Sequence, residues 1–290
     1  MITPFTSSGE LDFSGAARLA KQLVADGNDG LVVSGSTGES AMLDDDERIE
    51  LWRVVAEAVT VPVVAGSTTG DTRHSVELTK EAAKAGVSGI LATTPYYSRP
   101  SQHGIAQHFQ AVAEATDLPV ILYDIPSRTG RRLSPSTVLG LASEVSNVVG
   151  LKDASGDPSG SARLYAASRP DFAFYSGDDS LTLPLVALGA SGVISVAAHW
   201  CAAEFAEMIA AYLEGDVERA LAINTALLPS YSFQSSDDAP NPLPTKAVMR
   251  TMNLPAGQCR LPLGDAPATL DAEAAALLGT LQQWRASRTA

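Results

Sequence analysis

Short β-rich runs recur about every 30 residues along the chain, and each is nearly continuous in apolar character. Such runs are typical of parallel strands that are covered on both faces. Helical patterns lie between them, as at 44–59 and 75–86, and the second stops at Gly86. The alternation predicts βα units. The apolar runs span residues 29–35, 61–67, 88–95, 118–126, 147–155, 172–178 and 191–197.

The number of these units decides the fold class. Seven runs are clear, and the opening residues MITPF look like the tail of an eighth strand. Eight units predict an α/β fold, a (β/α)8 TIM barrel whose first strand is truncated. The alternative is a doubly wound open sheet, which usually carries a Gly-rich phosphate loop after its first strand. The sequence has no such loop, so we favour the barrel.

The pattern changes near Glu214 and becomes helical, at 216–229, 245–253 and 269–287. No strand pattern returns after this point. We therefore expect a catalytic barrel domain at 1–215 and a small C-terminal helical domain at 216–290. The polar, Pro-rich stretch 235–244 is expected to be a loop within the helical domain.

Charge and composition narrow the range of partners. The net charge of −13 disfavours nucleic acid and anionic membranes, which select for basic patches. No apolar run approaches the roughly 20 residues that span a bilayer, and the opening residues do not resemble a signal peptide. Cys201 and Cys259 are too few and too far apart for a disulfide framework or metal site. We expect a reducing, cytoplasmic setting.

Lys152 stands inside the strand pattern VVGLKD, whereas the other lysines lie on helical patterns, where a lysine normally faces solvent. A buried amine loses hydration and favours its neutral form, which is a nucleophile and can form a Schiff base with a ketone. The alternative is a structural ion pair with the adjacent Asp153. Consecutive strand residues point to opposite faces, so Asp153 is a poor partner. The lysines on helical patterns are Lys21, Lys80, Lys84 and Lys246.

Other polar side chains follow the predicted strands, and in βα barrels catalytic residues gather at this C-terminal face. They are Ser36, Thr37, Tyr97, Tyr123 and Arg128. A lysine, hydroxyl groups and an arginine suit a keto acid together with a second carboxylate substrate. The neighbouring acidic pair 178–179 has no third ligand at metal spacing, so we expect no metal.

Five motifs in this order and spacing resemble the dihydrodipicolinate synthases, members of the pyruvate-dependent class I aldolase superfamily of N-acetylneuraminate lyase. The resemblance includes PNPLPTKA in the helical region. It implies a (β/α)8 barrel, usually a homotetramer, which condenses pyruvate with L-aspartate 4-semialdehyde and needs no organic cofactor. The motifs are GSTGES (35–40), TPYYSRPSQ (94–102), YDIPSRTG (123–130), GLKDASGD (150–157) and GVISV (192–196).

The resemblance also implies roles for single residues. Lys152 matches the lysine that forms the Schiff base with C2 of pyruvate, and Tyr123 matches the proton-shuttling tyrosine. Thr37 matches the hydroxyl that links two tyrosines, and its N–H can hold the pyruvate carboxylate. Ser36 keeps a hydroxyl where threonine is commoner. Tyr97 matches the tyrosine that reaches into the neighbouring subunit's site.

Three further positions concern substrate binding. Arg128 matches the arginine that grips the carboxylate of the semialdehyde, for which its planar fork is well suited. Gly177 and Ile194 match positions that line the pyruvate pocket. Ser36 keeps open another pyruvate-dependent aldolase, a neuraminate lyase or a 2-keto-3-deoxy sugar-acid aldolase, whereas Arg128 argues against the neuraminate lyases. A non-catalytic, metabolite-binding barrel is the remaining alternative.

Family members are often inhibited by lysine at a tetramer-interface site, and this chain matches that site only in part. Without the glutamate that would pair with the inhibitor's ammonium groups, we expect weak or absent inhibition. Ser40, Ala41 and Tyr96 match, whereas Asp45, Gly70 and His74 stand where inhibitable relatives have His, Asn and Glu.

Overall fold

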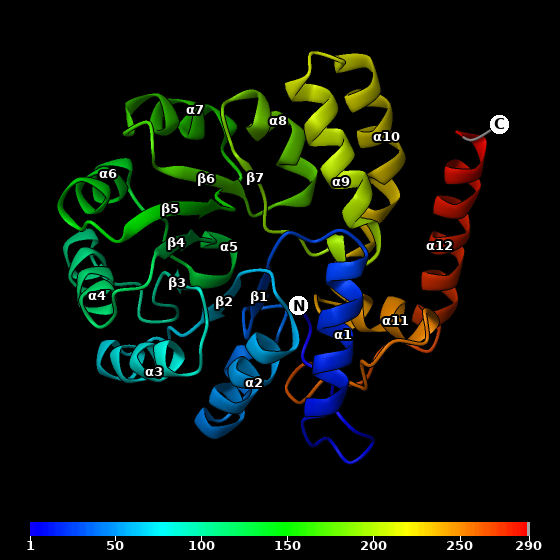
Figure 1. Cartoon of the computed structure of the whole chain (residues 1–290), viewed down its shortest axis with the longest axis horizontal. Helices are drawn as coiled ribbons and strands as arrows, with labels where there is room; N and C mark the ends of the chain where they lie inside the picture. Colours follow the sequence, from blue (N-terminus) through cyan, green and yellow to red (C-terminus); the bar gives the residue numbers. More distant parts are fainter. Residues whose placement is uncertain (289–290) are drawn as a thin grey trace.

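The structure, a computed structural model, describes residues 1–288. One parallel sheet of seven strands runs through the molecule, with the strands side by side in chain order (Figure 1). All seven predicted runs form strands, each shorter than its apolar run. The strands are β1 (Leu31–Val33), β2 (Val63–Gly66), β3 (Gly89–Thr93), β4 (Val120–Asp124), β5 (Val148–Asp153), β6 (Ala173–Ser176) and β7 (Gly192–Val193).

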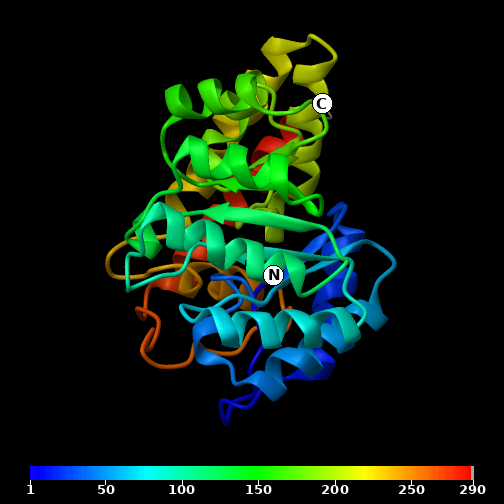
Figure 2. The ribbon, with the colours of Figure 1, turned by 90° about the vertical axis from the view of Figure 1, so that its left-hand side faces the viewer.

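Helices alternate with the strands and pack along the outside of the curled sheet (Figures 1 and 2). The predicted helix at 44–59 forms because Asp44 and Glu47 make a reciprocal capping box at its start. The next helix ends before Gly86, whose φ of 84° breaks it. This part contains α1 (Phe13–Ala25), α2 (Asp45–Ala58), α3 (Thr72–Lys84), α4 (Gln102–Glu114), α5 (Pro126–Thr129), α6 (Pro135–Glu144), α7 (Pro158–Ala167) and α8 (Thr182–Ala187), with 3-10 turns η1 (Ser40–Met42) and η2 (Asp179–Leu181).

The opening segment does not add an eighth strand to the sheet among residues 1–288. Phe5 makes only an isolated antiparallel bridge with Leu11. Residues 1 and 2 instead connect β1 to the start of α9: Met1 N donates to the carbonyl of Val32 in β1, and Ile2 N donates to Nε2 of His199 at 3.0 Å. Burial lowers the pKa of His199 to about 3, which keeps its ring neutral and able to accept this bond.

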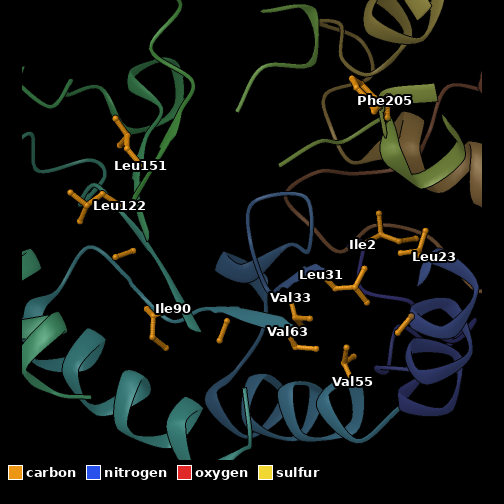
Figure 3. Close-up of a cluster of buried hydrophobic side chains, with 14 of the residues drawn as sticks. Ile2, Leu23, Leu31, Val33, Val55, Val63, Ile90, Leu122, Leu151 and Phe205 are labelled. Carbon is orange, nitrogen blue, oxygen red and sulfur yellow. The ribbon is translucent and has the colours of Figure 1, made fainter. Parts of the chain in front are cut away.

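Apolar side chains from the opening segment, the strands and the helices meet in one continuous core (Figure 3). Ile2 is fully buried within it, beside residues of β1 and α1. Trp52 of α2 is also fully buried, and its indole N–H donates to Ser34 Oγ at 2.6 Å, just after β1. This bond satisfies the one polar group that the indole brings into the core.

The chain after β7 is helical, as the sequence predicts. Lys246, which we expected on a solvated helix face, is fully buried on α11. The prediction was wrong because helical periodicity alone does not reveal a charged partner, and Glu39 supplies one at 2.6 Å. No helix within residues 1–288 is both long and apolar enough to cross a bilayer. The helices are α9 (Ala198–Leu213), α10 (Val217–Phe233), α11 (Leu243–Thr251) and α12 (Leu270–Ser287).

Candidate active site

Lys152 and Tyr123 lie directly opposite each other on β5 and β4, as partners in the parallel register. Tyr123 is 4% exposed, and Lys152 is half-buried. The lysine Nζ lies 4.2 Å from the centroid of the tyrosine ring. Among the cation–π contacts of residues 1–288, this one alone joins a cation to a tyrosine ring.

The residues next to them in sequence point the other way. Asp153 accepts hydrogen bonds from Ser161 Oγ at 2.5 Å and Tyr165 Oη at 3.2 Å, both on α7. It therefore faces the helices rather than Lys152, as the strand alternation predicts. Its register partner Asp124 is also buried, and burial raises the pKa of Asp124 to about 6.

Gly177 follows β6 and packs against the stem of Lys152. A Cβ at this position would lie 3.0 Å from the lysine Cγ and 3.1 Å from its Cε. Ile194, just beyond β7, is half-buried and donates its N–H to the carbonyl of Ser176 at 2.9 Å. The two positions thus lie just after the C-terminal ends of the neighbouring strands β6 and β7, of which β6 is next to β5.

Asp179, at the start of η2 just after β6, is a buried acidic side chain. Its Oδ2 accepts the N–H groups of Val196 at 3.2 Å and Ala197 at 2.7 Å, which fixes the segment after β7. Burial raises the pKa of Asp179. Within residues 1–288 no three His, Cys, Asp or Glu side chains are grouped as metal ligands.

Ser36 and Thr37 lie in a tight loop between β1 and η1. Gly38 N donates to Gly35 O at 3.0 Å, and Glu39 N donates to Ser36 O at 3.1 Å. The backbone N–H groups of Ser36 and Thr37 have no acceptor within the described residues, and both residues are half-buried. Backbone N–H groups that are left free in such a loop can hold a carboxylate.

Asn241, which the sequence analysis did not single out, connects two of the predicted residues. Its Nδ2 donates to Thr37 Oγ1 at 2.9 Å, and its carbonyl oxygen accepts from Arg128 Nη2 at 3.4 Å. Thr245 donates to its Oδ1 at 3.2 Å, which fixes the amide orientation. Because Thr37 accepts from Asn241, its own hydroxyl hydrogen remains available for a substrate. The only sequence signal for Asn241 was the motif PNPLPTKA. Within that motif, an asparagine between two prolines looks like an ordinary loop residue.

The structure does not bring the predicted hydroxyl relay together in the isolated chain. Tyr97 is 96% exposed, with a φ of 70°, and projects from the loop after β3. No hydrogen bond among residues 1–288 joins the hydroxyls of Tyr97, Tyr123, Ser36 or Thr37 to one another. The relay, and the participation of these four residues in it, stay predictions. Arg128 on α5 is exposed, so its guanidinium is accessible to a ligand.

Four positions that the resemblance assigns to the family's lysine site form two contacting pairs. His74 Nε2 pairs with an Asp45 carboxylate oxygen at 2.9 Å. Gly70 packs against Tyr96, whose carbonyl oxygen would lie 3.4 Å from a Cβ at the glycine. The carboxylate and the imidazole at this place therefore bind each other.

A parallel βα sheet that carries a strand lysine beside a tyrosine, with a tight loop of free backbone N–H groups and an arginine at the same strand ends, defines a class: the Schiff-base-forming lyases of the class I aldolase type. The model of the dihydrodipicolinate synthetase family matches residues 1–280. The chain belongs to this family.

Similar proteins agree with this assignment. The 4-hydroxy-tetrahydrodipicolinate synthase of Acidothermus cellulolyticus is 51% identical over 272 residues, which cover 92% of this chain and 86% of that protein. The enzyme of that name from Moorella thermoacetica is 48% identical and covers 91% and 90%. The crystal structure of the Cyanidioschyzon merolae synthase with lysine bound is 41% identical, with a TM-score of 0.93 and coverage of 97% and 96%.

Proposed function

We propose that this chain condenses pyruvate with L-aspartate 4-semialdehyde to give 4-hydroxy-tetrahydrodipicolinate, a step of diaminopimelate and lysine biosynthesis. The observation that carries the proposal is the placement of Lys152 against both Tyr123 and Gly177 at the strand ends where Thr37 and Arg128 lie. The named activity of relatives up to 51% identical supports it.

The first half of the reaction uses Lys152. Its amine adds to C2 of pyruvate, and loss of water leaves an imine. Tyr123 gives and takes the protons that addition and dehydration require. The N–H groups of Ser36 and Thr37 hold the pyruvate carboxylate. Loss of a methyl proton then gives an enamine, because the protonated imine accepts the electron pair.

The second half needs Arg128. Its guanidinium binds the carboxylate of the semialdehyde, and the enamine carbon attacks the aldehyde. The amine of the bound substrate then displaces the lysine nitrogen, which closes the ring and frees Lys152. No organic cofactor takes part in these steps. Gly177 and Ile194 line the pyruvate side of the pocket.

Three aspects of organisation belong to the same proposal. Residues 1–215 form the catalytic barrel, in which the opening segment takes the place of a full first strand. Residues 216–290 form the helical domain, of which 289–290 lie outside the described residues. The assembly is a homotetramer in the cytoplasm. The extreme exposure of Tyr97 supports a role in a neighbouring copy's site, and the unpaired Cys201 and Cys259 fit a reducing compartment.

Borohydride trapping tests the chemistry. Pyruvate and borohydride should give one covalent adduct per chain, mapped to the peptide that contains Lys152, and Lys152→Ala should abolish it. Lys84→Ala, at an exposed helical lysine, is the matched control and should leave the adduct intact. A wild-type protein that forms no adduct would overturn the proposal.

Substrate assays separate the alternatives. The purified protein should consume pyruvate together with aspartate semialdehyde, and it should not cleave N-acetylneuraminate or 2-keto-3-deoxy sugar acids. Efficient cleavage of a sugar acid, with no condensation, would assign the chain to the rival aldolases while leaving the trapping result in place.

A further inference from the structure

The buried ion pair between Glu39 and Lys246 lies outside the reaction described above. Lys246 Nζ is 2.6 Å from Glu39 Oε1, and the two side chains are 1% and 0% exposed. The same Nζ donates to the carbonyl of Gln258 at 2.9 Å and lies 4.1 Å from the centroid of the Phe5 ring. Burial lowers the pKa of Lys246, and the carboxylate of Glu39 opposes that effect.

Glu39 belongs to the loop that carries Ser36 and Thr37. It follows Gly38 directly and adopts a left-handed backbone conformation, with φ at 57°. A side chain other than glycine costs about 1 kcal/mol or more in that region, so surrounding contacts must hold it there. The Glu39 carboxylate supplies such contacts, because it binds residues that are distant in sequence, Lys246 and Arg260.

A second bond fixes the other oxygen of the same carboxylate. The backbone N–H of Arg260 donates to Glu39 Oε2 at 2.9 Å. The Arg260 guanidinium then makes two bonds of 2.6 Å to Glu47 at the start of α2. The segment 258–260 is thereby attached to both ends of the stretch 39–47, which begins in the carboxylate-binding loop.

Stability alone does not account for such a pair. Two buried charges lose hydration, and replacing both by apolar groups of similar volume is often neutral or stabilising. What the pair does provide is a fixed distance between α11 and the loop, with an ion pair at one carboxylate oxygen and a backbone hydrogen bond at the other. An apolar contact would allow the loop to slide.

We propose that Lys246 is a positioning residue for the reaction: through Glu39 it holds the loop of Ser36 and Thr37 in the geometry that binds the pyruvate carboxylate. This inference rests on the proposed function. Lys246 itself touches no reacting atom, so its effect should appear in pyruvate binding more than in the later chemical steps.

Steady-state kinetics of Lys246→Met and Glu39→Gln test this role. Each variant should raise the KM for pyruvate about tenfold with a smaller change in kcat, since a displaced carboxylate site weakens ground state and transition state together. The KM for aspartate semialdehyde should change little. All assays are run at a temperature where circular dichroism shows the variant to be folded.

Arg285→Met is the matched control. Arg285 on α12 pairs with the buried Glu204 of α9 at 2.6 Å, so its loss also weakens the packing of the C-terminal helices. It makes no contact with the loop at 36–39. It should lower the Tm and leave the KM for pyruvate unchanged.

The double variant Glu39→Gln/Lys246→Met separates stability from positioning. Neither charge is left unpaired, so the Tm should recover relative to the single variants, whereas the KM for pyruvate should stay high. A wild-type KM in the double variant, or single variants that behave like Arg285→Met, would overturn the inference. Failure of the wild-type protein to trap pyruvate would instead overturn the proposed function.

Discussion

Gly177 shows how a single missing side chain shapes the site. A Cβ there would approach Lys152 Cγ and Cε to 3.0 and 3.1 Å and Ala154 Cβ to 2.9 Å. Real Cβ atoms rarely come so close, so the lysine stem would have to move. The glycine therefore determines where the amine of Lys152 can stand relative to Tyr123.

We predict that Gly177→Ala slows Schiff-base formation with pyruvate about 10²-fold, because a shift of roughly 1 Å in a reacting group has an effect of this size. Single-turnover borohydride trapping measures the rate. Gly140→Ala on α6 is the control, since nothing lies within 4 Å of a Cβ there. Equal rates in the two variants and the wild type would contradict the expectation.

Residues of the site differ in how visible they are in sequence. Lys152 and Tyr123 could be found because polar side chains interrupt apolar strands. Asn241 was missed because a polar residue in a Pro-rich loop carries no periodic signal, and its partner Thr37 is distant in sequence. Lys246 was assigned to solvent for the same reason: only the fold brings Glu39 to it.

At the scale of helices and strands, the sequence predicted more than it did for contacts between side chains that are distant in the chain. The apolar runs located every strand of the sheet, since parallel strands buried on both faces leave an unbroken pattern. The runs overestimated strand length, most of all for 191–197, of which only Gly192–Val193 pairs with β6. The opening segment was predicted to be an eighth strand because it is apolar. Its apolar residues are instead buried by packing in the core, without pairing to the sheet.

The contact between α3 and α4 depends on a buried histidine. His108 is 3% exposed, and its Nδ1 lies 3.0 Å from Thr72 Oγ1. Within residues 1–288 its Nε2 is buried without a hydrogen-bond partner. Burial lowers the pKa of His108 to about 4. The folded protein thus favours the neutral ring more than the unfolded chain does.

Acid should therefore weaken this contact. The contribution of His108 is present above the unfolded pKa of about 6.5 and is lost as the pH falls toward the folded value, by about 2 kcal/mol between pH 7 and pH 5. Urea unfolding of wild type and His108→Gln at both pH values measures the difference. The exposed His103→Gln on the same helix is the control. The prediction would be contradicted if the difference in free energy of unfolding between the wild type and His108→Gln were as large at pH 5 as at pH 7.

At the scale of the whole molecule, the surface around Asp45 and His74 differs from the family's inhibitor site. The carboxylate and the imidazole pair with each other at 2.9 Å, and both side chains remain 40% or more exposed. Where the resemblance implies a glutamate that pairs with the ammonium groups of a bound lysine, this chain has His74. Charge complementarity to a diamino acid is thus largely removed.

We predict that lysine inhibits this protein weakly or not at all. Steady-state condensation rates across a lysine titration measure the effect. The variant Asp45→His/His74→Glu, which restores the charges of inhibitable relatives, should be more sensitive than the wild type. Half-maximal inhibition of the wild type at low lysine concentration would refute the prediction.

The attachment of the loop of Ser36 and Thr37 to residues 246 and 258–260 also bears on how the protein is made. The loop leaves the ribosome well before Lys246 and Arg260, since Arg260 follows Glu39 by 221 residues. Strands and helices near the beginning can fold during synthesis, but a nascent chain lacks the contacts that hold Glu39. Catalytic competence should accordingly require that the chain has emerged through residue 260, and fragments truncated before α11 should be inert even where their sheet has formed.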